Sequence, residues 1–408
     1  MDDVTLTGRR LHRYVWRALS VLACVLLGGG SFANAVVNIT RDSNPTAALR
    51  FAASDASALA TKGDLLLSKP NPVSSDIVAN ADSAHTSLVM QAINPRALRQ
   101  LSFAAETRGD AARARALIVL STATSRRDFG AQLWLIENGV RSGDMAKTLS
   151  HYDIALRIST ESAALLYPIL SAALPDESVQ AALVPYIKSN PAWLGSFLIY
   201  AQGTGAQPVA VAQTILKGGG LPSGERFRAI QTGLIAQLAS RADFEEALRF
   251  YMSLPGANKA VPVSTRFEKM TTNPQFAPIT WEIQNSAGIE SGFEPITQAG
   301  ALQLHVLANS GERASAIRKL LYLTSGSYAF AESRNALRFG DGAAAYWQLS
   351  CIRSGQSTVI WRSDIDAAKF SIAADCKAQM FDFVVAGGAE QDGCELVIKS
   401  VSLNKLSN

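Results

Sequence analysis

Residues 109–121 read GDAARARALIVLS, and residues 143–155 read GDMAKTLSHYDIA. Both stretches begin with Gly-Asp, and the step from 109 to 143 is 34 residues, which is the period of tetratricopeptide repeats. In such a repeat the glycine allows a tight turn between two helices, and the aspartate caps the second helix. Small and large residues then occupy the positions where the second helix packs on the first: Ala114, Ile118 and Ser121 in one stretch, and Thr148, Tyr152 and Ala155 in the next.

Helical spacing of alanine and leucine extends beyond these two stretches, and it predicts a tetratricopeptide-like helical repeat domain over residues 47–256. A third unit begins at Ala242-Asp243, where Glu246 predicts a capping box. Stacked helix pairs form a curved groove that binds extended peptides or partner proteins and does no chemistry. Packing between repeats is the alternative role for Trp134. The candidate groove residues lie on the first helices of two units: Arg99, Gln100 and Phe103 in one, and Gln132, Trp134 and Glu137 in the other.

The composition excludes several classes of protein. The chain has 408 residues, room for two domains. Its hydrophobic share of 48% and charged share of 18% exclude a disordered chain. A net charge of +4 gives no electrostatic reason to expect nucleic acid as a partner. A polytopic membrane protein is excluded too, because one stretch alone is apolar over the length of a membrane span.

The first 35 residues have the parts of an export signal. A basic region from Arg9 to Arg17 precedes an uncharged apolar core, and Ala33-Asn34-Ala35 matches an A-x-A cleavage site. Gly28-Gly29-Gly30 is expected to weaken the helix before that site. The alternative is an uncleaved anchor, because Ala18–Val37 is long enough to cross a membrane. Either way the arginines stay inside, so the body is expected in the periplasm, either free or anchored in the inner membrane.

The pattern changes in the second half of the chain. Prolines and a glycine gather between Pro255 and Pro278, and residues 257–275 within this stretch are predicted to be a linker. Over residues 276–408, apolar residues alternate with period two, for example in 301–307, 345–351 and 395–403. Short strands split by Gly and Asp turns predict an antiparallel β-sandwich or jelly-roll. The predicted fold is therefore an α-helical solenoid followed by a β-sandwich, with an N-terminal signal or anchor helix.

Residues suited to catalysis or metal binding are sparse. No two of the four histidines are spaced as metal ligands, and the second-half cysteines, Cys351, Cys376 and Cys394, form no C-x-x-C pair. In an oxidising compartment one disulfide is expected, with one thiol left over. The pair Asp364-x-Asp366 fits turn capping better than glycoside hydrolysis. We therefore expect neither an enzyme nor a bound cofactor.

Aromatic side chains are the better indication of a ligand in the second half, because sugars stack on exposed aromatic rings. Trp281, Tyr346, Trp347 and Trp361 are the aromatic residues considered. Tyr346 and Trp347 are adjacent in a predicted strand, so they point to opposite faces. Trp347 shares its face with Leu349 and Cys351 and is expected in the core. The predicted glycan contacts are Tyr346, Gln348 and Trp361.

Short motifs carry a family resemblance. They are Trp281, Gly326-Ser327-Tyr328-Ala329-Phe330, Trp347-Gln348-Leu349-Ser350-Cys351, Trp361, Phe370, Cys376-Lys377-Ala378-Gln379 and Ile398-Lys399-Ser400-Val401-Ser402-Leu403. This order resembles the jelly-roll, carbohydrate-binding-like domain that ends certain extracytoplasmic tetratricopeptide-like proteins of proteobacteria, which are encoded beside exopolysaccharide genes. The resemblance covers the whole architecture.

The resemblance implies that Cys351 and Cys376 form the disulfide. The chain departs from the family pattern at Cys394, where no cysteine is expected, and at Ser400, where an acidic residue is usual. That second departure leaves open the structural calcium that many carbohydrate-binding modules hold.

Together these features lead to three hypotheses about function. The first is a non-enzymatic cell-envelope scaffold that binds partner proteins, and in some cases polysaccharide, and assists exopolysaccharide assembly or export. The second is a soluble periplasmic carbohydrate-binding protein in which the solenoid is a spacer. The third, a carbohydrate-active enzyme, is disfavoured by the missing acid/base pair.

Overall fold

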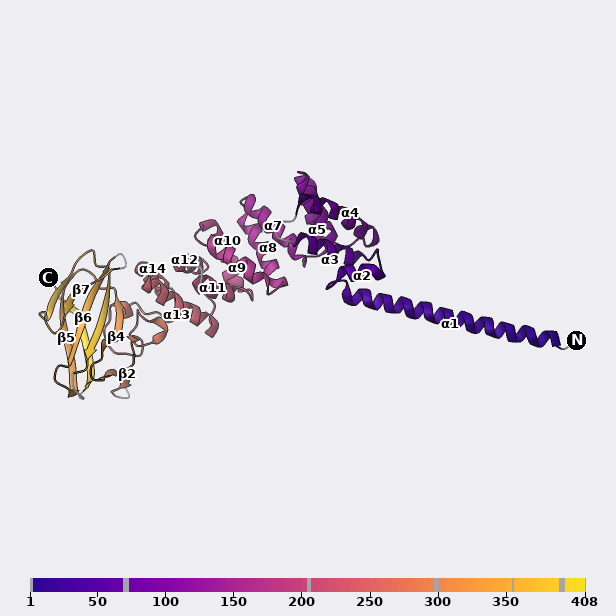
Figure 1. Cartoon of the computed structure of the whole chain (residues 1–408). Coiled ribbons are helices and arrows are strands. Elements are labelled where there is room, and N and C mark those ends of the chain that lie inside the picture. Colours follow the sequence, from indigo (N-terminus) through magenta and orange to yellow (C-terminus); the bar gives the residue numbers. More distant parts are fainter. Residues whose placement is uncertain are drawn as a thin grey trace. The chain divides into compact units, whose positions relative to one another are not determined.

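A computed structural model describes residues 3–68, 73–203, 207–296, 301–353, 356–388 and 393–407, with side chains from Val15 onward. The side chains of Arg9, Arg10 and Arg13, part of the expected basic region, lie outside the described residues. Helices come first along the chain and strands follow (Figure 1). The predicted fold class is confirmed. The chain forms two compact units, Met1–Ser162 and Ala163–Asn408.

The first unit is helical throughout its described part. Its helices are α1 (Asp3–Thr40), α2 (Pro45–Phe51), α3 (Ala56–Leu67), α4 (Ser74–Met90), α5 (Pro95–Thr107), α6 (Ala111–Thr124), α7 (Phe129–Arg141) and α8 (Met145–Ile158).

The repeat signature corresponds to real turns and contacts in this unit. Gly109 and Gly143 have φ of 81° and 73°, the left-handed region that glycine adopts freely. Asp110 and Asp144 then cap α6 and α8, each accepting a backbone N–H bond of 3.0 Å. The small and large residues predicted to pack are all buried: Ala114, Ile118, Ser121, Thr148, Tyr152 and Ala155.

The first helix is longer than the sequence predicts. α1 runs without interruption through Gly28-Gly29-Gly30 and the A-x-A motif. The expected weakening of the helix at the glycines is wrong, because a helical glycine costs only about 1 kcal/mol relative to alanine. By length and composition, Val15–Thr40 could cross a membrane.

The second unit contains six α-helices in its described part, followed by strands. The helices are α9 (Ser162–Ala173, beginning at the boundary), α10 (Glu177–Ser189), α11 (Leu194–Gly203), α12 (Pro208–Lys217), α13 (Glu225–Ser240) and α14 (Phe244–Met252), and two 3-10 turns are η1 (Val261–Val263) and η2 (Pro274–Phe276). The predicted third repeat is present as α13 and α14, with Tyr251 and Leu254 buried. Its capping box is wrong in detail, since the Asp243 side chain makes no cap hydrogen bond.

In the described part of the second unit, ten strands form two antiparallel sheets of five strands each. The strands are β1 (Glu282–Ile283), β2 (Ile289–Pro295), β3 (Leu302–Ala308), β4 (Arg313–Leu321), β5 (Gly326–Phe339), β6 (Ala344–Arg353), β7 (Gln356–Arg362), β8 (Lys369–Ile372), β9 (Ala378–Ala386) and β10 (Cys394–Lys405). One sheet has the order β1-β4-β9-β6-β7, and the other has the order β2-β3-β10-β5-β8. Non-consecutive neighbours in both sheets fit the predicted sandwich.

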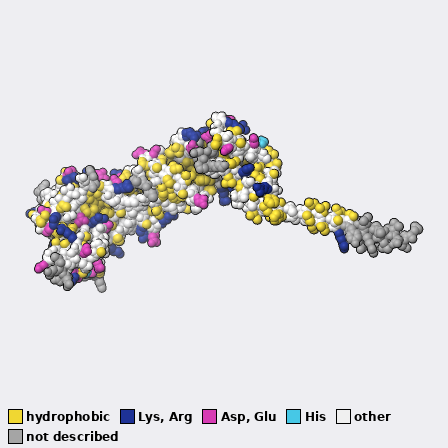
Figure 2. Space-filling model, viewed as in Figure 1, with side chains coloured by type: hydrophobic (Ala, Val, Ile, Leu, Met, Phe, Trp, Pro, Cys, Tyr) yellow, Lys and Arg dark blue, Asp and Glu magenta, His cyan; other side chains and the backbone are white. Residues whose placement is uncertain are grey.

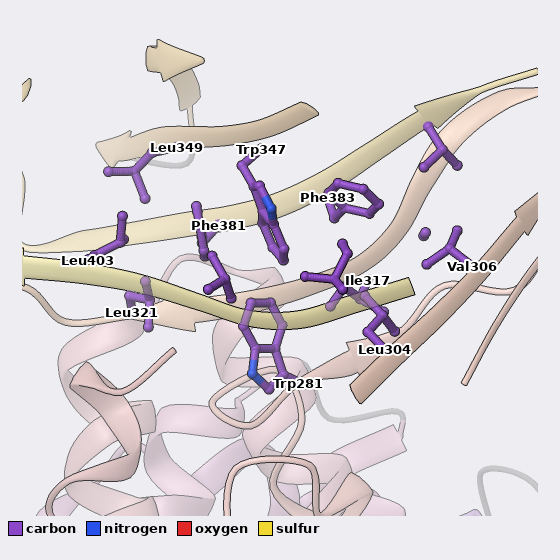
Figure 3. Close-up of a cluster of buried hydrophobic side chains, with 14 of the residues drawn as sticks. Trp281, Leu304, Val306, Ile317, Leu321, Trp347, Leu349, Phe381, Phe383 and Leu403 are labelled. Carbon is purple, nitrogen blue, oxygen red and sulfur yellow. The ribbon is translucent and has the colours of Figure 1, made fainter. Parts of the chain in front are cut away.

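Aromatic rings fill the space between the sheets (Figure 3). Trp347 on β6 stacks on Phe381 with ring centroids 4.6 Å apart, and Phe383 lies 4.8 Å away. Trp281, immediately before β1, approaches Trp347 to 5.7 Å. Trp347 is therefore in the core, as strand alternation predicts.

The segment expected as a linker lies against the sheets. The Thr265 hydroxyl donates to the Val401 carbonyl at 3.0 Å, and the Trp281 N–H donates to the Thr271 carbonyl at 2.7 Å. Phe267 is buried and packs on Trp281. The expected division into residues 47–256, 257–275 and 276–408 stays a prediction, but the packing of 265–281 places part of the linker in the sandwich.

The predicted disulfide is present. Cys351 on β6 is bonded to Cys376, just before β9, and Cys394 is a buried free thiol. The bond closes a loop of 25 residues between a strand and the approach to its neighbour.

We predict that replacing Cys351 and Cys376 by alanine lowers the free energy of unfolding of the sandwich by about 3 kcal/mol, the chain-entropy value for a loop of this length. Urea unfolding followed by the fluorescence of the buried tryptophans measures it. Adding a reductant should reproduce the loss in the native chain and change nothing in the variant. Equal stability of the oxidised native chain and the variant contradicts this assignment.

Candidate functional site

A groove crosses the first repeats, between α3, α5 and α7 of the first unit. Its volume is about 790 Å³. Apolar side chains line its walls and charged side chains its rim and floor. The lining residues are Asp64, Leu67, Ser68, Pro95, Arg96, Arg99, Phe103, Ser125, Arg127, Asp128, Phe129, Gly130, Leu133, Trp134 and Glu137.

Arg99 lies at the floor of this groove and bonds to two other helices. Its Nε donates to Asp128 Oδ1 at 2.7 Å, and one terminal nitrogen donates to both Asp64 oxygens at 2.9 and 2.8 Å. Burial by itself would lower the pKa of Arg99, but Asp128 and Asp64 outweigh it and the pKa is raised. The guanidinium is therefore a fixed charge that ties α3 and α7 to α5.

The two predicted glutamines have structural roles. Gln100 is 1% exposed and donates to the Ala60 carbonyl at 2.6 Å and to Asp64 at 2.7 Å. Gln132 is 1% exposed as well; it donates to the Arg126 carbonyl and lies 2.8 Å from His151 Nδ1. Neither side chain is among those that line the groove, because both are buried in helix contacts behind its wall.

Besides Arg99, three of the predicted residues line the groove. Phe103 is half-buried one turn after Arg99, whose guanidinium lies 5.7 Å from its ring. Trp134 is mostly buried, and its indole N–H donates to Glu106 at 2.7 Å, so packing between repeats holds it at the edge of the groove. Glu137 lies on the rim.

Sequence reasoning missed Phe129 and Leu133, which complete the apolar wall. With Glu137 they recur every four residues along α7, and that spacing could have identified them as one helix face. Gly130 is also needed there. A Cβ at this position would lie 2.8 Å from Arg99 Cδ, so only glycine leaves room for the arginine.

One polar atom of the groove has no partner. Asp128 is 7% exposed, and its Oδ1 already accepts from Arg99 and from the Ala131 N–H that it caps. Its Oδ2 has no hydrogen-bond partner among the described residues. A buried carboxylate oxygen left without a donor is costly, and the charge of Arg99 on the same carboxylate offsets part of that cost.

The predicted glycan contacts are not available as stacking surfaces. Tyr346 is 4% exposed; the Arg362 guanidinium covers its ring at 4.1 Å, and Arg313 donates to its hydroxyl. Trp361 is in the core, where its ring packs on Phe330. Gln348 is half-buried. The expectation that Tyr346 and Trp361 present free rings is wrong, because arginines from β4 and β7 cover the Tyr346 ring and the second sheet covers the Trp361 ring.

A polar hollow of about 600 Å³ lies on the other sheet, above Gly292 and His305. His305 Nε2 is 3.0 Å from Glu395, and Nδ1 is 3.5 Å from Glu294. Among the described residues no group of histidine, cysteine, aspartate and glutamate has a metal-binding arrangement.

No family model, curated protein or solved structure that was compared matches the chain. Its function therefore has to come from the groove, the sheets and the N-terminal helix.

Lys319 is a buried lysine on β4 with one hydrogen-bond acceptor. Its Nζ donates to the Ile279 carbonyl at 2.6 Å and lies 5.9 Å from the Trp281 ring. The side chain is fully buried, and burial lowers the pKa of Lys319 from 10.5 to about 7.

We predict that the sandwich becomes more stable as the pH rises from 7 to 9.5. In this range the unfolded chain keeps a proton on Lys319 that the folded chain has lost, so stability increases by up to about 1.4 kcal/mol per pH unit. Lys319→Met should remove most of this slope and raise stability at pH 7. Lys369→Met, at an exposed position, is the control. Equal slopes in urea unfolding for the native chain and Lys319→Met refute the prediction.

Proposed function

We propose that the protein is a non-enzymatic scaffold of the cell envelope that binds an extended segment of a partner protein in the groove between α3, α5 and α7. The groove itself is the observation that carries the proposal. Four of the residues expected from the repeat pattern line it together: Arg99, Phe103, Trp134 and Glu137.

The chemistry of the groove suits a peptide. Phe103, Phe129 and Leu133 are half-buried apolar side chains that a ligand would cover completely, the environment in which interface residues contribute most to binding. Charges of both signs on the rim, such as Arg127 and Glu137, favour a polar flank on each side.

The N-terminal helix and the disulfide support a location outside the cytoplasm. α1 could cross a membrane by length and composition, and a disulfide is typical of an oxidising compartment. We place the body in the periplasm of a bacterial envelope. The resemblance to proteins encoded beside exopolysaccharide genes supports assembly or export of a polysaccharide as the process served.

The soluble carbohydrate-binding alternative loses support. It depended on exposed rings at Tyr346 and Trp361, and both are buried. Among the described residues that line the polar hollow above His305 there is no phenylalanine, tyrosine or tryptophan. Partner-protein binding is therefore the function we favour.

We predict that a photo-reactive phenylalanine analogue at Leu133, in the full chain in its own host, forms a discrete covalent adduct with one envelope protein. The same analogue at Val140, an exposed position at the end of α7 outside the groove lining, should form none. Adding Phe103→Ala should weaken adduct formation about fivefold or more, the effect of losing about 1 kcal/mol of binding.

Identical adducts at positions 133 and 140, or no adduct at 133, contradict the groove as a binding site. An adduct at 133 that Phe103→Ala leaves unchanged also contradicts it.

A further inference from the structure

α1 and α2 form an antiparallel pair within the first unit. The Phe32 ring meets the Phe51 ring with centroids 6.5 Å apart. Further along α1, Val37 is 4% exposed and packs on Ala48 and on α3. Phe32 therefore pairs with the later residue Phe51, and Val37 with the earlier residue Ala48. This order means that α2 runs antiparallel to α1, toward the centre of the apolar stretch.

The length of that stretch sets the depth of this contact. No charge occurs between Arg17 and Arg41. A helix of about 20 residues crosses the roughly 30 Å hydrocarbon core of a bilayer, so a span that begins at Ala18 ends near Val37. Phe32 lies five residues earlier, which is about 7.5 Å inside that boundary. Phe51, in contact with Phe32, is thereby brought to the edge of the membrane.

Other exposed apolar side chains lie at the same end of the helix pairs. The Ala56 carbonyl, at the start of α3, accepts from the Ser87 hydroxyl of α4 at 2.7 Å and from Asn94, just before α5. The end of α2 and the stretch from the end of α4 to α5 therefore meet around Ala56. The exposed residues there, which we call the collar, are Phe51, Val89, Met90 and Ile93.

The collar side chains are apolar and exposed, and Ile93 also borders a hollow lined by Arg41, Asp42 and Arg96. The side chains of Val89 and Ile93 are 68% and 67% exposed. Figure 2 shows hydrophobic side chains along α1 and where α1 joins the rest of the first unit. Burying such side chains 5–10 Å into the headgroup and acyl boundary is how interfacial elements bind membranes.

We propose that α1 is retained as a transmembrane anchor and that the collar rests in the outer lipid interface of the same bilayer. The occupant of the collar is lipid, because the collar continues directly from the surface of the membrane-spanning helix. Cleavage after Ala35 would remove Phe32 and uncover the Phe51 ring. Retention of α1 keeps the contact between these two rings and keeps Phe51 at the edge of the membrane. The repeats are then held against the membrane at the end where α3 and α5 begin.

Depth-dependent quenching tests this inference. The full chain carries Cys24→Ser, which removes the exposed thiol, and Cys394 stays buried. A polarity-sensitive fluorophore is placed on Met90→Cys or Ile93→Cys, and on Val140→Cys as the control of similar exposure at the far end of α7. The protein is reconstituted in vesicles of phosphatidylcholine and phosphatidylglycerol with and without lipids that carry a nitroxide near the headgroup.

We expect a blue shift and a loss of fluorescence to the nitroxide lipid at positions 90 and 93, and neither at 140. Collar labels that match the control overturn the proposal. A blue shift without quenching by the lipid means that protein covers the collar, and it overturns the proposal as well. So does a chain isolated from its host that begins at Val36.

Discussion

Arg99 carries one positive charge that three helices share. The Arg99 side chain extends from α5. Its guanidinium donates hydrogen bonds to Asp64 on α3 and to Asp128, the residue that caps α7. Gly130 leaves the space that the arginine occupies, and Gln100 binds the same Asp64 from behind. Because the charges are largely removed from water, each depends on the others, and loss of one partner leaves a buried charge uncompensated. The positions of α3, α5 and α7, and with them the groove, depend on this cluster.

The cluster also relates the two surfaces proposed for the first unit. Asp128 lies at the start of α7 and Arg99 in the first turns of α5, the end at which the collar residue Ile93 is found. With the collar on a membrane as proposed, the groove would begin beside that membrane, which suits a partner that is itself membrane-bound or that emerges from the membrane. Neither surface requires an enzymatic group. The sandwich contributes a disulfide-closed core, and outside that core the Arg362 guanidinium lies over the Tyr346 ring.

Local patterns predicted the repeats and the strands well, because a glycine turn, an aspartate cap and period-two alternation are each set by nearby residues. Strand alternation also correctly placed Trp347 on the core face of β6 and Tyr346 on the opposite face. It could not show that Arg313 and Arg362, from other strands, cover Tyr346, since those contacts depend on sheet order. From the sequence, Arg99 and Gln100 are two adjacent polar residues on one helix, and both were predicted to face the groove. Their different surroundings depend on where α3 and α7 pack against that helix. The uninterrupted α1 was missed because three glycines were given more weight than the length of the apolar helix around them.

Hydrogen exchange of the α7 amides tests most directly whether Arg99 holds the groove together. Arg99→Met leaves Asp64 and Asp128 without their shared charge partner, which should cost about 3–5 kcal/mol locally. The account predicts that amides of α3, α5 and α7 then exchange about a hundredfold faster or more, while the strands of the sandwich keep their rates. Arg141→Met, which removes an exposed pair with Glu137 on the same helix, should change the rates little. If α7 in Arg99→Met exchanges at the rate of the native chain, the shared charge does not organise the groove and the account is contradicted.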